Sequence, residues 1–254
     1  KTLSLLKLRL GWGVTGQQDI GGYYDYMGRY TYGNQYARYP FGSAYYYTLR
    51  PEGYNENLKW EGTTTWNVGI DYGFLNDRVY GSIDVYQRNT KDLLSWVPTP
   101  AGSNLSNYIN KNIGKLQNQG IEFSVNGKVI SNEDLYWEVG LTATYKKNEI
   151  TELYDGASIS TGGIAGGVGN EVQIYAVGQP MNTFYVYEQV YDENGNPIEG
   201  VYVDRNNDGQ ITTDDKYFYH DPNADLFFGI SSNLKYKNWT LYLQGRANFG
   251  NYVY

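Results

Sequence analysis

The protein has 254 residues, of which 17% are aromatic, 29 are Tyr and 31 are Gly, a mixture that favours strands and turns over helices. Its formal net charge is −7 and its 20 Lys and Arg are scattered, which argues against a nucleic-acid-binding surface, because phosphate contacts need clustered cations. The absence of Cys excludes disulfides and thiolate metal sites.

Seven segments alternate apolar and polar side chains with a period of two, which indicates strands with one apolar face. In the first segment, Leu8, Leu10 and Trp12 fall on the same face. In chain order the segments are residues 6–14, 65–75, 79–89, 121–129, 135–146, 226–236 and 239–249. A spanning helix needs ~18 to 20 consecutive apolar residues, which the sequence lacks, whereas a spanning strand needs only ~9 to 11 residues.

The connections between these segments alternate between short and long. The short ones are turns at 76–77, 131–134 and 237–238, and the long ones cover 15–63, 91–119 and 148–224. Membrane barrels have short periplasmic turns and long extracellular loops. Aromatic residues also cluster beside the short turns, as expected for an interfacial girdle; they are Tyr72, Phe74, Trp137, Tyr236 and Trp239. The sequence therefore predicts an all-β, antiparallel, up-and-down transmembrane β-barrel.

Seven strands are too few to close a large barrel. Plugged outer-membrane transporters have 22 strands, and unpaired strand edges are not tolerated in lipid. We expect either that the chain is part of a longer polypeptide or that further strands in the long connections close a small barrel. The sequence breaks off in mid-strand at Tyr254, which favours the first interpretation.

Several blocks, in order along nearly the whole chain, resemble the SusC-like (RagA-like) family of TonB-linked outer-membrane proteins. The most recognisable block is Asn55–Glu61, followed by Thr63–Gly69. The other blocks are Leu8–Gly16, Ser82–Tyr86, Lys91–Leu94, Asn112–Gly114, Asn118–Glu122, Lys146–Ile150 and Asp204–Asp215.

The resemblance implies that residues 1–254 are a segment of the C-terminal domain of a 22-stranded barrel, with 149–224 as a long extracellular loop region. It implies import of oligosaccharides or peptides across the outer membrane of a Gram-negative cell, with a SusD-like surface lipoprotein as a lid. Energy would come from the TonB complex through an N-terminal part, because this sequence contains neither a plug domain nor a recognisable TonB box. The barrel wall would contact outer-membrane lipid.

Residues 204–215 fit the spacing of an EF-hand-type calcium loop. Oxygen-bearing side chains occupy the ligand positions, and Gly209 stands where that loop turns sharply. The predicted Ca²⁺ ligands are Asp204, Asn206, Asp208, Gln210 and Asp215. Asp215 replaces the usual Glu and shortens the reach. The alternative is a turn rich in Asn, Asp and Gly that needs no ion.

The connection at 15–63 is dense in Tyr, and Tyr23, Tyr24 and Tyr26 are candidate substrate contacts. Aromatic faces with hydroxyl groups suit sugar rings, although Tyr also serves to pack loops on one another or on a lid. Catalysis is not expected, because a Ser/His/Asp arrangement would have to be built on His220, the sole His, and residues 219–222 are interpreted as the return from the calcium-like loop.

A different class of function, a soluble or surface-attached β-rich carbohydrate-binding module, would also explain the tyrosines and the calcium-like loop. The two hypotheses differ in where the apolar faces point. A soluble module must bury them against a second sheet, whereas a barrel exposes them to lipid.

Overall fold

The computed structural model describes residues 2–17, 22–164 and 171–254. Its main feature is one antiparallel sheet with the strand order β1-β6-β7-β8-β9-β16-β17, so β1 and β17 form its edges. The strands are β1 (Leu3–Gly16), β6 (Gly62–Phe74), β7 (Val79–Pro98), β8 (Tyr108–Ser131), β9 (Leu135–Leu153), β16 (Leu226–Tyr236) and β17 (Trp239–Phe249). All seven predicted segments are strands, which confirms the all-β, antiparallel prediction. Within the described ranges, no helix is long and apolar enough to cross a membrane.

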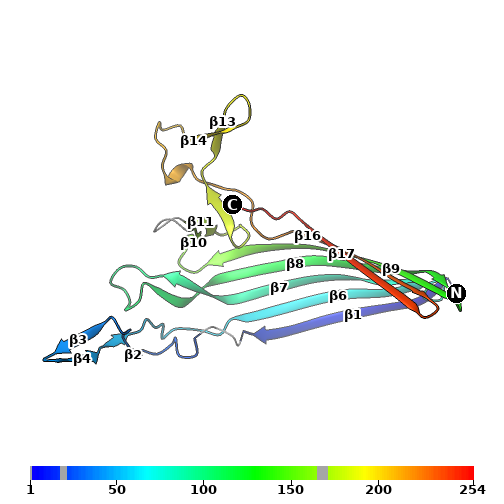
Figure 1. The fold of residues 1–254 in the computed structure, drawn as a ribbon, viewed down its shortest axis with the longest axis horizontal. Coiled ribbons are helices and arrows are strands. Elements are labelled where there is room, and N and C mark those ends of the chain that lie inside the picture. The colour runs from blue at the N-terminus through cyan, green and yellow to red at the C-terminus, as the bar shows by residue number, and fades with distance from the viewer. Residues whose placement is uncertain (1, 18–21, 165–170) are drawn as a thin grey trace.

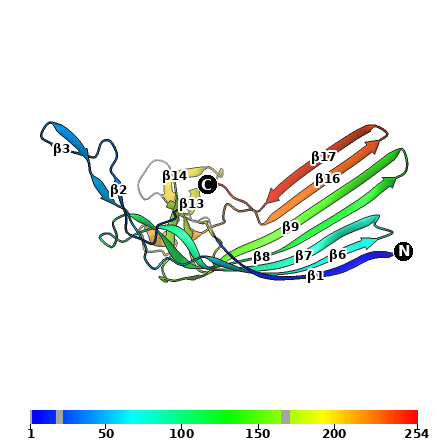
Figure 2. The same ribbon diagram turned by 90° about the horizontal axis from the view of Figure 1, so that it is seen from below.

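The short turns gather at one end of the sheet and the long connections at the other, as both ribbon views show (Figures 1 and 2). The turn between β6 and β7 passes through Leu75, Asn76 and Asp77, all with φ between 53° and 58°. Asn and Asp tolerate this left-handed backbone better than most residues do. In the next turn the side chain of Asn132 accepts hydrogen bonds from the amides of Asp134 and Leu135. These short turns join strands that pair directly, β6 with β7 and β8 with β9.

The prediction of a loop over 91–119 is wrong. β7 continues to Pro98 and β8 begins at Tyr108, so only residues 99–107 connect them. The reason is an irregularity after Thr90, where the pairing of β7 with β8 shifts and Asp92 takes a left-handed φ of 55°. Such a bulge breaks the alternation of side chains that marks a strand in the sequence.

The long connections contain small sheets of their own. In the first, β2 (Tyr30–Tyr32) pairs with β5 (Leu49–Pro51) and β3 (Arg38–Phe41) pairs with β4 (Ala44–Tyr47), and together they form an arm that projects beyond the main sheet (Figure 1). The last long connection holds a four-stranded sheet and a hairpin. Its elements are β10 (Ile159–Gly163), β11 (Glu171–Tyr175), β12 (Thr183–Val186), β13 (Gln189–Tyr191), β14 (Pro197–Tyr202), a 3-10 turn (Thr213–Asp215) and β15 (Tyr217–Phe218).

The hydrophobic core lies at the loop end. It consists of Leu93, Val97, Ile113, Leu116, Ile150 and Leu153. Ile159 and Tyr175, from the small sheet, and Met181 pack against these side chains. The core thus attaches the small sheet to the extended ends of β7, β8 and β9, which gives the loops a fixed base.

Candidate functional site

One face of the main sheet carries apolar side chains that remain exposed. A row across its middle runs through all seven strands: Leu8, Ile70, Ile83, Phe123, Ala143, Phe228 and Ala247. Leu10, one row nearer the loop end, is 74% exposed. None of the buried hydrophobic side chains of the described residues belongs to these rows. The face is therefore not covered by a second sheet, as a soluble module would require, but is suited to an apolar surrounding.

The opposite face is polar and charged. Arg9 of β1 pairs with Asp71 of β6 at 2.8 Å and with Asp84 of β7 at 2.9 Å. A Cβ at Gly69 would overlap both the Asp84 carboxylate and the Arg9 guanidinium, so any other residue there would displace this cluster where it crosses β6. Buried or half-buried charges are tolerated when they are paired. A face of this kind suits a water-filled or protein-filled lumen.

Aromatic side chains lie at the short-turn end of the apolar face, where the girdle was predicted. The Tyr72 and Phe74 rings are 5.8 Å apart, and the Tyr72 hydroxyl donates to the backbone oxygen of Ser124 at 2.9 Å. Trp137 Nε1 donates to Ser232 Oγ at 3.0 Å. Amphipathic rings that keep a polar partner are typical of a membrane–water interface.

At the loop end, aromatic and charged side chains from separate segments enclose a hollow of about 580 Å³. It is lined by Gly22, Tyr23, Tyr24, Asp25, Arg29, Trp96 and Asn110. Trp96 stacks on Tyr108 with an interplanar angle of 12°. Asn110 donates to the Asp25 carboxylate. Arg29 Nε is the one buried side-chain nitrogen or oxygen of the described residues that has no hydrogen-bond partner. Arg29 Nη2 lies 3.5 Å from an Asp25 carboxylate oxygen, so the hollow combines aromatic surfaces with a paired cation.

Tyr23 also borders a second hollow of about 340 Å³, together with Tyr26 and Trp60. The structure thus places all three candidate tyrosines around two hollows that share Tyr23. Sequence reasoning missed Trp96 and Arg29. Trp96 falls in the stretch misassigned as a loop, and only the fold brings it next to residues 23–29. The available signal was a Trp a few residues beyond the predicted strand 79–89.

The calcium-like loop is closed by its own backbone amides. Asp215 is fully buried, and its carboxylate accepts hydrogen bonds from the amides of Arg205 and Thr212, both at 2.8 Å. Asp204 accepts from the amides of Asp208 and Gly209. The Asp208 carboxylate accepts hydrogen bonds from Asn206 Nδ2 and from the backbone N–H of Gln210. No group of three or more acidic or His side chains in the described part of the chain converges on a point that could hold an ion, so the Ca²⁺ site stays a prediction.

Replacing Asp215 by Asn is expected to loosen the 204–215 loop at neutral pH. The Thr212 amide, with those of Arg205 and Asn206, holds the pKa of the Asp215 carboxyl below its usual value, because these bonds favour the ionised form. Because the pKa is lower in the folded state, the ionised carboxyl stabilises the folded loop at pH values above the unfolded pKa of about 3.9. This stabilisation is lost as the pH falls through the folded-state pKa. We expect hydrogen-exchange protection of the Arg205 and Thr212 amides to fall about tenfold at pH 7.

The matched control is Asp214→Asn, which removes an exposed carboxyl from the same turn. Equal loss of protection in both variants would show that Asp215 has no special role. As the pH falls through the lowered folded-state pKa of Asp215, the wild type and Asp215→Asn should converge in amide protection, after correction for intrinsic exchange rates. Added Ca²⁺ should raise protection in the wild type, and EDTA should reverse it, if the loop binds the ion. No change with either would contradict the calcium prediction.

The imidazole ring of His220 packs against two aromatic side chains. Its ring stacks on Tyr252 at 3.7 Å with an interplanar angle of 5°, and the Tyr219 ring meets it edge-on at 4.4 Å. Stacking uses the faces of the imidazole and holds the segment near the C-terminus against β15. The arrangement serves packing.

Comparison with known proteins agrees with this geometry. Residues 4–248 match the model of the family described as TonB dependent receptor-like, beta-barrel. The chain is 50% identical, over 99% of its length, to the TonB-dependent receptor SusC of Bacteroides thetaiotaomicron, and it covers 26% of that protein. It is 33% identical over 77% of its length to the TonB-dependent receptor P3 of Formosa agariphila, covering 21% of it.

Solved structures of the RagAB peptide transporter share the fold. One superposes with a TM-score of 0.77 over 98% of this chain and 27% of that chain, at 24% identity. The importer in its 'open-open' state gives a TM-score of 0.74 at 25% identity, over 98% of this chain and 26% of that one. The chain therefore spans about a quarter of the length of the proteins that it matches.

Proposed function

Because the chain belongs to the TonB dependent receptor-like, beta-barrel family, we propose that it forms part of the wall and the outer loops of an importer for oligosaccharides in the outer membrane. The observation that carries the proposal is the uncovered apolar face across seven strands, backed by a charged face. The 50% sequence identity to a receptor named SusC supports the resemblance to SusC-like proteins that the sequence blocks show.

In this proposal the apolar face meets lipid, the charged face lines the lumen, and the long connections lie outside the cell. Outer-membrane barrels place their long loops there and their short turns in the periplasm. Strands β1 and β17 would pair with further strands of the complete barrel, because a barrel in lipid tolerates no open edge. A 22-stranded barrel is the size that the family resemblance implies.

The partners would act at the two ends of the barrel. A SusD-like lipoprotein would cover the loop end as a lid, and the TonB complex would supply energy through an N-terminal part of the receptor. The arm at 30–51 supports the lid contact, because its aromatic side chains have no core to pack into. Among them Tyr36 is 87% exposed and Tyr32 is 76% exposed. We propose binding and transport, not catalysis, for the whole receptor.

The hollow at Trp96 supports oligosaccharides as substrates. Sugar rings stack on aromatic faces while their hydroxyl groups bond to polar side chains. Trp96 and Tyr24 supply the faces, and Asp25, Arg29 and Asn110 supply the polar groups. Peptides are a second candidate, because the Arg29–Asp25 pair, 3.5 Å apart, could bind charged peptide groups.

Replacing Trp96 by Ala in the complete receptor is expected to weaken oligosaccharide binding at least tenfold, because a central aromatic anchor contributes about 2 kcal/mol or more at a binding site. The measurement is calorimetric titration of the purified receptor with an oligosaccharide mixture and, separately, a peptide mixture. Tyr36→Ala, at the exposed tip of the arm, is the control. Unchanged affinity in Trp96→Ala would remove the hollow from the proposal, and binding of peptides alone would favour the second candidate.

A further inference from the structure

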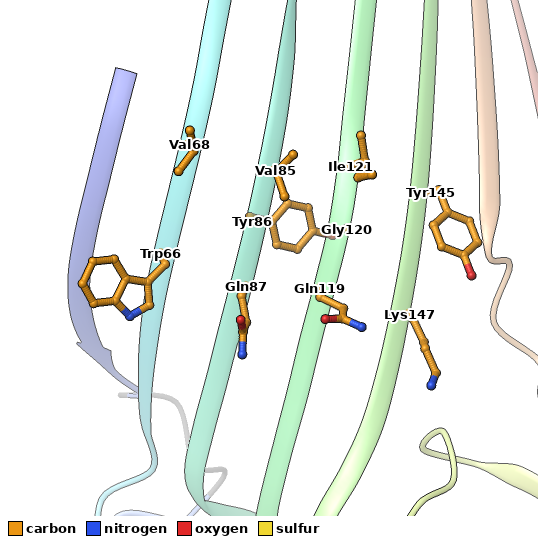
Figure 3. A pocket seen from close by; sticks show the side chains of 10 residues that line it. All are labelled: Trp66, Val68, Val85, Tyr86, Gln87, Gln119, Gly120, Ile121, Tyr145 and Lys147. Atoms are coloured by element: carbon orange, nitrogen blue, oxygen red, sulfur yellow. The ribbon is translucent and has the colours of Figure 1, made fainter. Parts of the chain in front are cut away.

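A groove of about 470 Å³ indents the apolar face close to its loop end (Figure 3). Two paired rows of side chains form it. The inner row, nearer the middle of the sheet, is Val68, Val85, Ile121 and Tyr145, and the outer row is Trp66, Gln87, Gln119 and Lys147. The groove thus passes from an apolar floor to a rim with one aromatic ring, two amides and one ammonium group.

The next row towards the loops marks the limit of the apolar face. It consists of Thr64, Asn89, Gln117 and Glu149, all polar. The groove rim therefore lies at the height where apolar surface gives way to polar surface, which in a membrane barrel is the headgroup level. At this height an occupant must be amphiphilic, since its apolar part faces the floor and its polar part faces the rim.

We propose that this groove binds a phosphorylated glycolipid of the outer leaflet, an inference that rests on the proposed outer-membrane location. An acyl chain would lie on Val85 and Ile121. The phosphate would pair with Lys147, and sugar hydroxyl groups would bond to the amides of Gln87 and Gln119.

The charge at the rim favours an anionic group. Lys147 is half-exposed, and its Nζ lies 3.0 Å from a carboxylate oxygen of Glu149. An ammonium has three donors, so two remain for a ligand. Exposed ion pairs of this kind are weak. Glu149 also lies one row further out than Lys147, so a phosphate next to the acyl region would meet the cation first.

The amides and aromatic rings favour a sugar headgroup over a simple glycerol phosphate. Gln87 and Gln119 each offer a donor and an acceptor, which is the hydrogen-bonding capacity of a hydroxyl-rich ring. Trp66 on β6 and Tyr145 on β9 flank the groove, because these strands lie on either side of β7 and β8 (Figure 3). Both rings are more than half exposed. Ring faces at headgroup level suit sugar C–H groups.

The test uses the complete receptor, delipidated in detergent and analysed by native mass spectrometry. The probes are lipid A, the same lipid A after removal of its phosphates, and phosphatidylglycerol. We expect lipid A to bind at least tenfold more tightly than either of the others. We also expect Lys147→Glu to abolish this preference, and Ile121→Trp, which fills the floor, to reduce binding of lipid A.

Lys115→Glu is the matched control, because Lys115 is also half-exposed and paired with an acid, Glu152, but lies outside the groove. Equal binding of the phosphorylated and dephosphorylated lipids would overturn the proposal, as would tighter binding of phosphatidylglycerol or equal losses in Lys147→Glu and Lys115→Glu. Substrate binding is measured on the same samples. If the wild-type receptor binds lipid A but no substrate, the importer proposal alone is contradicted. If it binds substrate but not lipid A, the lipid site alone is contradicted.

Discussion

The Phe123→Arg variant is expected to lose about 2–4 kcal/mol of folding stability in a bilayer, the cost measured for Arg near the midplane on the lipid face of a barrel. Phe123 lies in the middle row of the apolar face and is 38% exposed. In lipid a guanidinium there would have no water and no acidic partner. The expected readout is a lower urea midpoint for the complete receptor refolded into vesicles, together with less receptor in the outer membrane of cells.

Glu122→Arg provides the control, because Glu122 is the preceding residue on β8 and points to the charged face. There a new Arg would lie opposite Asp84, so we expect a change within about 1 kcal/mol. If the two variants were equally stable, the apolar face would not contact lipid, and a soluble packing of the sheet would have to be reconsidered. If Glu122→Arg were the more damaging of the two, the faces would be assigned the wrong way round.

The seven long strands could be predicted from the sequence because alternation needs no knowledge of a partner. Each strand shows its apolar side wherever one face meets a uniform surrounding. The outer halves of β7 and β8 could not be predicted in this way. Beyond the bulge at Asp92, burial of Leu93 and Val97 depends on contact with a small sheet some 60 residues later in the chain, which no local pattern records.

The residues that line the loop-end hollow could be named from the sequence only in part. A run of Tyr indicated a binding surface, whereas the fold selects which of these rings share a hollow with Trp96 and Arg29. The calcium-like loop stays a prediction. Its spacing fits an ion site, and the same spacing also lets Asp215 accept hydrogen bonds from the loop's own amides. Spacing alone does not distinguish the two uses of a carboxylate.

The second large effect is expected at the charged face. Arg9 joins β1 to β6 and β7, because its Nε bonds to Asp71 at 3.0 Å and its Nη2 bonds to Asp84 at 2.9 Å. Arg9→Glu would replace these bonds by three neighbouring carboxylates. Arg9 is about one-third exposed, so solvent screens part of its attraction to the two carboxylates. We still expect Arg9→Glu to lower the urea midpoint of the complete receptor, because it replaces attraction between three side chains by repulsion.

A charge exchange separates this interaction from a general effect of substitution. In Arg9→Glu combined with Asp84→Arg, the new guanidinium would lie between Glu at position 9 and Asp71, so most of the lost stability should return. Gly69 of β6 has no side chain, so a long side chain from β1 or from β7 can reach across β6 in both the wild type and the exchanged variant. A double variant as unstable as the sum of the single variants would show that the three groups are not coupled. Recovery would show that this cluster ties the edge strand β1 to the wall. This role matters because, among the described residues, β1 pairs with β6 alone.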